Sequence, residues 1–299
     1  ELWSIFDFLM PQYLFNYHYF QKQYENDIVK NNDEEKTKQL KKLVTPFILR
    51  RNKKEVLTEL PDKIEQNMIL PFNDEEEKIY VANLAKANKE LQELYDIEGS
   101  DKMQILKLLT RLRQICLEPR LVYDNIDQPS SKLKACMELI KTMQENKQKV
   151  LLFSSFTSVL DLIAEECQKA GITYYMLTGS TSKEDRKELV SRFQKDDTTL
   201  FLISLKAGGT GLNLTSAEAV IHFDPWWNVS AQNQATDRAY RIGQKNNVQV
   251  FNLVMKDSVE EKIIELQKRK KELADMFVEN NSGGLSQMSK EDILSLFTM

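Results

Sequence analysis

The stretch KVLLFSSFTSVLDLIAEECQKAGITYYMLTG, residues 149–179, carries the clearest pattern of secondary structure in the chain. Its first apolar run, KVLLFSSF (149–156), has the length and composition of a buried strand, and ITYYMLTG (172–179) predicts a second one. Between them TSVLDLIAEECQKAG has a helical period and ends at Gly171, a residue typical of the position after a helix. A strand, a helix and a strand in this order predict two parallel strands joined by a right-handed crossover.

The same alternation continues downstream. SKEDRKELVSRFQ has a helical period, and Thr181 with Glu184 forms the capping-box pattern that opens such a helix. Further strands are predicted in three apolar segments: TTLFLIS (198–204), AVIHFD (219–224) and VQVFNLVM (248–255). We therefore predict an α/β domain over residues 132–256, in which helices cover both faces of a parallel sheet.

Helical segments are predicted on both sides of this domain. Residues 1–60 are expected to be helix and loop rich in aromatic side chains. Residues 61–131 are expected to be a linker that includes a short extended stretch, DKIEQNMIL, followed by two antiparallel helices. Ser258 and Glu261 form a second capping-box pattern before the long charged helix EEKIIELQKRKKELADMF. With a last short helix, SKEDILSLF, residues 257–299 form a helical addition after the sheet.

The composition is that of a globular protein with a sizeable core. The chain has 299 residues, a net charge of −4 and 41% hydrophobic residues. It has no run of eighteen apolar residues, and its start, ELWSIFDFLM, lacks the basic segment of a signal peptide. We expect a piece of a longer intracellular protein without a membrane partner, located in the cytoplasm or nucleoid of a bacterium or in the nucleus of a eukaryote.

Cysteine and histidine chemistry is not expected. Cys116, Cys136 and Cys167 lie far apart in the sequence, two of them in amphipathic segments, which predicts buried free thiols in a reducing compartment. His18 and His222 have no metal-ligand spacing with the cysteines, so we predict no metal site.

A basic segment lies near the N-terminus. KTKQLKKLVTPFILRRNKK, residues 36–54, holds eight basic residues and no acidic one. This density suits a phosphate contact, but it is equally typical of a solvated helix face beside an apolar stripe. The sequence leaves both interpretations open.

Unusual segments follow the predicted strands at their carboxyl ends, where open α/β sheets bind ligands. The loop LKAGGTGLNLT concentrates Gly208, Gly209 and Gly211, which let backbone N–H groups approach a phosphate. Lys206 and Thr210 add a charge and a hydroxyl beside them. A tight turn without a ligand is the alternative interpretation.

Two arginines stand out in NQATDRAYRIGQK. Arg238 and Arg241 are three residues apart, on one face of the helix predicted here, and Gln234 lies one turn earlier. Together they form a planar multi-donor surface suited to a polyphosphate. The alternative is surface ion pairing with Asp237 or another carboxylate, which contributes about 0.3–0.5 kcal/mol on a helix. Since adjacent helical residues do not face each other, Asp237 is a poor partner for Arg238.

The turn DPWWN offers a similar choice for Trp226 and Trp227. Paired tryptophans commonly bury their rings in a core, but an indole in a surface turn can stack on or wedge against nucleic acid. We expect one ring to point inward and one outward.

Two nucleotide-binding motifs are absent from the sequence. No Gly-Lys dipeptide occurs, so no GxxxxGK[ST] loop exists to hold the β and γ phosphates, and no DExH-type tetrapeptide follows a strand to hold Mg²⁺. We therefore expect that this chain alone does not hydrolyse a nucleotide by the P-loop route.

Seven segments resemble, in order and spacing, the second half of the SWI/SNF-type ATPases of helicase superfamily 2: ELWSIFDFLMP, TPFILRRNKKEV, LTRLRQIC, KVLLFSSFTSVLD, LTGSTSKEDR, SLKAGGTGLNLTSAEAVIHFDPWWNVSAQNQATDRAYRIGQ and VFNLV. The resemblance covers nearly the whole chain. It implies the RecA-like second lobe of an ATP-driven translocase on double-stranded DNA, preceded by the tail of the first lobe. ATP with Mg²⁺ would then be held mainly by the first lobe, upstream of Glu1.

The resemblance also implies roles for individual residues. Arg238 and Arg241 would be arginine fingers that reach the γ-phosphate across the cleft between the lobes. The ATP-binding residues would be Gln234, Gly211 and Asp237. The DNA-binding residues would be Ser154, Ser155, Ser180, Lys206, Gly208, Gly209, Thr210, Trp226 and Trp227. The helices of residues 1–60 and 72–120 would be protrusions of the lobes, and residues 257–299 a helical brace.

Three positions depart from the family pattern. Phe153-Ser154-Ser155 stands where the family usually has Phe-Ser-Gln, Val229 where it has Pro, and Tyr240 where it has His. Tyr240 is expected to leave the arginines in place, whereas Ser155 leaves open any contact that the family makes through its glutamine.

Three classes of function follow. The leading hypothesis is the second motor lobe of a DNA-dependent ATPase, inactive without its first lobe. The alternatives are a nucleotide-sugar or dinucleotide enzyme, which would need its own nucleotide loop, and a non-catalytic protein- or DNA-interaction module on a RecA-like fold. Protein partners beyond the first lobe, and the choice between nucleosome remodelling, displacement of other DNA-bound proteins and repair, stay open.

Overall fold

The computed structural model describes residues 2–31, 33–48, 60–95, 102–208 and 211–277. The chain divides into two units, the first formed mainly by Glu1–Thr58 and the second mainly by Glu59–Gln267. No helix among the described residues is long and apolar enough to cross a membrane.

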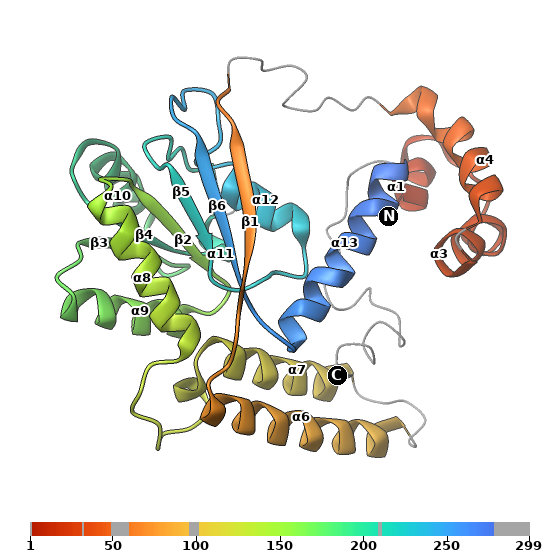
Figure 1. Ribbon diagram of the computed structural model, residues 1–299. Coiled ribbons are helices and arrows are strands. Elements are labelled where there is room, and N and C mark those ends of the chain that lie inside the picture. Colours follow the sequence, from red (N-terminus) through yellow and green to blue (C-terminus); the bar gives the residue numbers. More distant parts are fainter. Residues whose placement is uncertain (1, 32, 49–59, 96–101, 209–210, 278–299) are drawn as a thin grey trace. The chain divides into compact units, whose positions relative to one another are not determined.

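A parallel sheet of six strands forms the centre of the second unit (Figure 1). The strand order is β1-β6-β5-β2-β4-β3. The strands are β1 (Lys63–Leu70), β2 (Val150–Ser154), β3 (Tyr174–Leu177), β4 (Leu200–Ser204), β5 (Ala219–His222) and β6 (Val248–Met255). Every residue of β2, β4 and β5 is buried, which requires layers on both faces. The predicted α/β fold is confirmed.

Strand β1 corrects the predicted domain division. The sequence placed residues 61–131 outside the sheet, but β1 pairs in parallel with β6 from Lys63 opposite Val248 to Leu70 opposite Met255. As an edge strand it is largely solvent-exposed, so its sequence KIEQNMIL lacks the apolar run that marks a central strand. Its partner lies 185 residues later, and no local pattern reveals such a pairing.

Helices cover both faces of the sheet. They are α8 (Ser131–Glu145), α9 (Thr157–Lys169), α10 (Lys183–Lys195), the short α11 (Leu205–Gly208) and α12 (Val229–Thr236). Side chains alternate along β2, so that Leu152 packs in one apolar cluster with α8 and α9, and Leu151 in another with Phe193 of α10.

The cysteines are buried and free, as predicted. Cys136 and Cys167 pack in the cluster under α8 and α9, and Cys116 packs in a separate cluster. Burial raises the pKa of all three thiols, that of Cys167 to about 12. They therefore act as small apolar side chains of the core.

The helix starts differ slightly from the predicted capping boxes. Ser182, not Thr181, caps α10, because its Oγ accepts the backbone N–H of Asp185 at 3.1 Å. Thr181 Oγ1 instead accepts the N–H of Thr178 at 3.0 Å and closes the preceding loop. Ser258 does precede the long helix α13 (Val259–Phe277), and its Oγ accepts the N–H of Glu260 at 3.1 Å.

The two helices predicted after the linker are confirmed as α6 (Asp74–Tyr95) and α7 (Lys102–Leu117), which lie side by side (Figure 1). They share an apolar cluster with the start of α13, and the one-turn helix η3 (Pro119–Leu121) follows α7.

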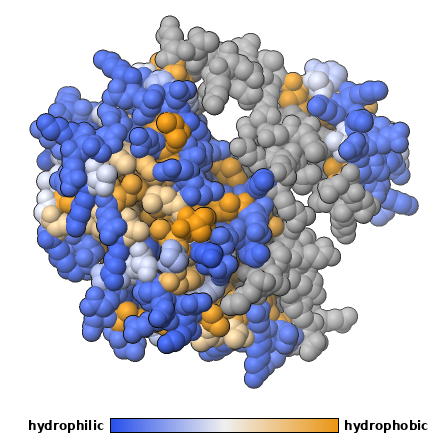
Figure 2. All heavy atoms as spheres, in the orientation of Figure 1, coloured by the Kyte–Doolittle hydropathy of each residue, from blue (hydrophilic) through white to orange (hydrophobic). Residues whose placement is uncertain are grey.

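Figure 2 shows hydrophilic side chains over much of the visible surface, with apolar patches between them. The predicted last helix, SKEDILSLF, lies outside the described residues.

The first unit is helical, as predicted for residues 1–60. Its elements are α1 (Leu2–Leu9), α2 (Tyr17–Phe20), the π-helix η1 (Gln21–Glu25), α3 (Asn26–Asn31), α4 (Glu34–Val44) and the 3-10 helix η2 (Thr45–Phe47). In α4, Leu40 and Val44 are buried while Lys38 is exposed. For the described part of the basic segment, this arrangement favours a solvated helix face beside an apolar stripe over a phosphate contact.

Candidate functional site

The carboxyl ends of three central strands meet at one edge of the sheet, with β2 between β4 and β5. From β2 the chain crosses over β4 to β3, whereas from the neighbouring β5 it continues in the opposite direction to β6, so the connections diverge between β2 and β5. Ligands of open α/β sheets bind at such a switch point. Ser155 follows β2, Lys206 follows β4 and Asp224 follows β5 at this edge.

The buried carboxylate of Asp224 organises the edge. Its Oδ1 accepts the hydroxyl of Ser154 at 2.8 Å and the backbone N–H of Ser155 at 3.0 Å. Its Oδ2 accepts the hydroxyl of Ser155 and, at 2.8 Å, the Nη2 of Arg113. Each oxygen therefore has two donors, which compensates the cost of burying the charge.

Arg113 ties α7 to this edge. Its guanidinium lies 5.4 Å from the ring centre of Trp227 and 5.6 Å from that of Trp226, and its Nη2 also donates to the Pro225 carbonyl at 3.2 Å. The sequence prediction missed Arg113. The available signal was an arginine within the apolar helical stripe of LTRLRQIC. A buried cation is retained only where an anion or aromatic faces receive it.

The solvent exposure of Trp226 and Trp227 differs less than predicted. Trp227 is 9% exposed and belongs to the apolar cluster of α6, α7 and α13, and the half-buried Trp226 packs against the same cluster. Trp227 therefore points inward as expected, but Trp226 is only partly outward. Contact of Trp226 with DNA stays a prediction, while burial leaves Trp227 little surface for such a contact.

The three predicted serines are in different environments. Ser154 is buried and Ser155 half-buried, and both hydroxyls bond to Asp224. Ser180 is exposed in the loop before α10, with its Oγ 2.8 Å from the Oγ1 of Thr178. Of the three, Ser180 has the most surface for an external phosphate.

The glycine loop is described in part. Lys206 is exposed on the one-turn helix α11, and Gly211 has a φ of +41°, in the left-handed region that favours glycine. Gly209 and Thr210 lie outside the described residues, so the predicted phosphate contact of this loop stays a prediction. The Nη1 of Arg186 donates to the Ala207 carbonyl at 3.2 Å and ties α10 to the start of the loop.

The arginine segment is not the helix that the sequence predicted. Helix α12 ends at Thr236, and both arginines lie in the turns that follow. The chain leaves the helix because Ala239 and Tyr240 pack into the apolar cluster on this face of the sheet. Gly243, with a φ of +101°, then reverses the chain toward β6.

The two arginines nevertheless stay close to each other. Arg238 is 9% exposed and Arg241 is exposed. Burial lowers the pKa of Arg238, and the like charge of Arg241 lowers it further, against the opposing effect of Asp237. Gln234 is exposed on the last turns of α12, on the same segment.

Gln244 holds the end of this segment and was not predicted. Its Nε2 donates to the carbonyl of Ala217 at 2.8 Å and to that of Ala239 at 3.2 Å. Its Oε1 accepts the N–H of Lys245 at 2.9 Å. One buried amide therefore joins the arginine turn, residues 237–243, to the loop before β5.

His222 of β5 contacts the last residue of α12, just before the arginine segment. Its Nε2 is 2.9 Å from the Oγ1 of Thr236, and its ring stacks on Phe153. Burial lowers the pKa of His222 to about 4, so the imidazole is neutral near pH 7. Among the described residues, no group of three His, Cys, Asp or Glu side chains could hold a metal ion.

The lowered pKa of His222 predicts a pH-dependent stability. Between about pH 6.5 and pH 4, the imidazole binds a proton in the unfolded chain, where its pKa is near 6.5, but stays neutral in the folded protein. The free energy of unfolding therefore falls as the pH drops through this range. We expect roughly 2–3 kcal/mol to be lost between pH 7 and pH 4.5 relative to His222→Gln, as measured by urea unfolding. Parallel losses in both proteins would contradict the neutral buried imidazole.

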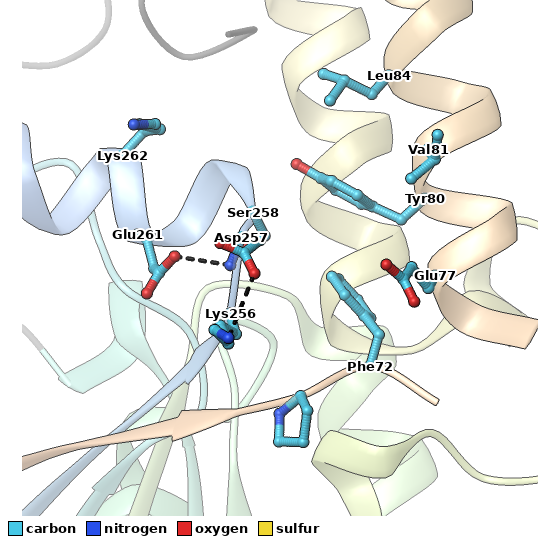
Figure 3. A pocket seen from close by; sticks show the side chains of 11 residues that line it. Phe72, Glu77, Tyr80, Val81, Leu84, Lys256, Asp257, Ser258, Glu261 and Lys262 are labelled. Atoms are coloured by element: carbon cyan, nitrogen blue, oxygen red, sulfur yellow. Dashed lines mark hydrogen bonds and ion pairs between the residues drawn. The ribbon is translucent and has the colours of Figure 1, made fainter. Parts of the chain in front are cut away.

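A separate cavity of about 520 Å³ lies where β1 and β6 end. Its apolar wall includes Phe72, Tyr80 and Leu84, and its rim includes Lys256 and Lys262 (Figure 3). The hydroxyl of Tyr80 accepts the backbone N–H of Val259 at 2.7 Å, which fixes the start of α13 to this wall. None of the residues predicted for ligand binding lines this cavity.

Two family models match the chain. The helicase conserved C-terminal domain matches residues 131–243, which run from the start of α8 to the end of the arginine turn. The SNF2-related domain matches residues 1–121, which include the N-terminal part of the first unit, β1, α6 and α7.

Curated relatives match over the whole chain. A putative ATP-dependent helicase/translocase of Bacillus subtilis, YwqA, is 37% identical over 308 residues, which cover 100% of this chain and 33% of the relative. The ISWI chromatin-remodeling complex ATPase ISW1 of Saccharomyces cerevisiae is 32% identical over 99% of this chain and 28% of its own length. The chain thus spans about a third or less of the length of the curated relatives it matches.

Solved structures give the same result. The Sulfolobus solfataricus SWI2/SNF2 ATPase core in complex with dsDNA aligns with a TM-score of 0.65 and 33% identity, over 99% of this chain and 63% of that one. The C-terminal domain of the Sulfolobus solfataricus SWI2/SNF2 ATPase aligns with a TM-score of 0.63 and 28% identity, over 79% and 98%. This chain therefore belongs to the SWI/SNF-type ATPases of helicase superfamily 2 and contains their RecA-like C-terminal lobe.

Proposed function

We propose that this chain is the second motor lobe of an ATP-dependent translocase on double-stranded DNA, and that Arg238 and Arg241 are its arginine fingers. The observation that carries the proposal is the proximity of the two like charges at the end of α12. Their repulsion and the burial of Arg238 both cost free energy, which Asp237 offsets only in part. An anionic group placed against the pair would offset both costs, as a transferring phosphoryl group does.

The two arginines would have different parts in this site. Arg241 is exposed and is the one with surface to meet a nucleotide held by another lobe. Arg238 is largely buried and would stabilise the negative charge of the same phosphoryl group from within the lobe. Gln234, Asp237 and Gly211 would complete the nucleotide side of the cleft, in agreement with the exposure of Gln234 and Gly211.

The nucleotide would be ATP, in keeping with the names of the ATP-dependent relatives. Magnesium would be held by the first lobe, because the described residues offer no group of three suitable ligands. The isolated chain would accordingly bind ATP weakly and would not hydrolyse it.

The DNA backbone would follow the exposed polar groups at the carboxyl edge. Ser180, in the loop before α10, and Lys206, on the short helix α11, follow the neighbouring strands β3 and β4. The hydroxyls of Ser154 and Ser155 would act from beneath this surface, because both already bond to Asp224. Phosphate contacts of this kind position a protein on DNA without selecting a sequence.

Binding of the isolated chain to a labelled DNA duplex is expected to be weak and sensitive to salt. With two or three phosphate contacts, the affinity falls roughly 10- to 40-fold between 50 and 200 mM salt. Lys206→Ala is expected to flatten the slope of log K against log salt by about 0.9, as measured by fluorescence anisotropy. Lys256→Ala, an exposed lysine at the separate cavity, is the matched control. Affinity that is independent of salt would count against the DNA surface.

A further inference from the structure

Helix α12 packs on the sheet without large apolar side chains. The residues that it buries are Gln232, Ala235 and Thr236. By contrast, α9 on the other face buries an apolar stripe that includes Leu160 and Ile163. Apolar contacts have no preferred direction, whereas hydrogen bonds fix one geometry. The place of α12 on the sheet is therefore set mainly by hydrogen bonds.

The first of these bonds joins the end of α12 to the central sheet. His222 Nε2 lies 2.9 Å from Thr236 Oγ1, and both side chains are buried. The same hydroxyl lies 3.3 Å from the Gln232 carbonyl, and when it donates there it accepts from an imidazole that carries its proton on Nε2. The stack of the His222 ring on Phe153 fixes the imidazole in turn.

The backbone of Thr236 continues this connection into the arginine turn. Its carbonyl accepts the N–H groups of Ala239 and Tyr240, both at 3.1 Å. These two residues lie between Arg238 and Arg241. Thr236 thus holds β5 with its side chain and the turn that carries both arginines with its carbonyl.

A second anchor lies one turn earlier, at Gln232. Its Nε2 donates to the Oδ1 of Asn252 in β6 at 3.0 Å, and its Oε1 accepts the N–H of Trp226 at 3.2 Å. Asn252 donates in turn to the Oδ1 of Asn67 in β1 at 2.9 Å. This anchor fixes the middle of α12 and leaves the orientation of its last turn to Thr236.

We propose that Thr236 and His222 are positioning residues, whose hydrogen bond sets the point at which Arg241 meets the nucleotide. The proposal rests on the proposed function of Arg241. Neither residue touches the nucleotide. Their effect is to hold the arginine turn in one place, and a displacement of about 1 Å at a reacting group can cost about 10²-fold in rate.

The test uses the full parent protein with both lobes and measures its DNA-stimulated ATPase rate. Thr236→Val keeps the shape of the side chain and removes the hydroxyl, and we expect kcat to fall about 10- to 100-fold with KM for ATP within about threefold. Thr236→Ala removes the same hydroxyl without bulk and is expected to behave alike. Thr236→Ser keeps the hydroxyl and is expected to restore at least half of the rate.

Thr142→Val is the matched control, because the hydroxyl of Thr142 in α8 bonds only to a carbonyl of its own helix, that of Glu138. Its rate is expected to equal that of the wild type. Thermal unfolding of every variant shows whether the protein is folded at the assay temperature. If both hydroxyl-free variants are folded and keep the wild-type kcat, the proposal is overturned.

A double-mutant cycle separates positioning from a general structural effect. In a protein that already carries Arg241→Ala, Thr236→Val is expected to cause no further loss, because the group that it positions is gone. A full additional 10-fold or greater loss would overturn the positioning role. Undiminished turnover of Arg241→Ala itself would instead refute the proposed function, so the two failures are distinguishable.

Discussion

Replacement of Arg241 by alanine in the two-lobed parent protein is expected to lower the DNA-stimulated ATPase rate by about 10³- to 10⁵-fold, the range that arginine fingers contribute in other nucleotide-hydrolysing enzymes. Arg241 is exposed at the end of the arginine turn, so its removal leaves the core of the lobe intact. KM for ATP is expected to change little, because most binding contacts would come from the first lobe. Steady-state phosphate release at saturating DNA measures both parameters.

Two further variants sharpen this experiment. Arg241→Lys is expected to recover little of the rate, since an ammonium group lacks the planar fork that meets two phosphate oxygens. Arg192→Ala is the control, because Arg192 is also exposed but lies on α10, 3.7 Å from Glu188. A wild-type rate for Arg241→Ala would reject the finger assignment and favour a non-catalytic interaction module.

Replacement of Lys132 by methionine is expected to destabilise the second unit by about 3–5 kcal/mol. Lys132 at the start of α8 lies 2.7 Å from both carboxylate oxygens of Glu260 in α13, and both side chains are 0% exposed. Glu260 also accepts the N–H of Met255 at 2.8 Å. Burial raises the pKa of Glu260, and without Lys132 its charge would be left unpaired in the core. The melting temperature is expected to fall by roughly 6–20 °C.

The double variant Lys132→Met/Glu260→Leu is expected to recover most of the loss, because no unpaired charge remains. Lys86→Met is the matched control: Lys86 pairs with Glu90 at 3.9 Å on the exposed face of α6, and such pairs contribute about 0.5 kcal/mol or less. Urea unfolding of the isolated chain gives all three free energies. If Lys132→Met is as mild as Lys86→Met, the buried pair does not stabilise the junction of α8 and α13.

Much of the sheet was predictable from local patterns. The apolar runs for β2 to β6 were all found, and β6 was predicted with its observed bounds, because central parallel strands are buried on both faces. The segment of β1 was predicted to be extended, but its place in the sheet was not predicted, because an edge strand has no such run. Its place depends on pairing with a distant strand, which periodicity does not report.

The sequence named candidate site residues, whose roles stay predictions, but it did not predict their local geometry. The motif around Arg238 and Arg241 was recognised, but the helix predicted for it ends at Thr236. The turn is set by the burial of Tyr240 against the sheet, a tertiary contact that outweighs helical propensity. The apolar stripe around Arg113 marks the arginine but not its partner Asp224, because the two residues are 111 positions apart.

The most direct test of Arg241 compares two nucleotide states in the parent protein. One is a non-hydrolysable ATP analogue, which mimics the bound substrate, and the other is ADP with aluminium fluoride, which mimics the transferring phosphoryl group. If Arg241 stabilises the transition state, Arg241→Ala binds the ATP analogue within about threefold of the wild type and loses at least about 10²-fold in affinity for the mimic. Equal affinities of the wild type and the variant for the mimic would contradict an arginine finger.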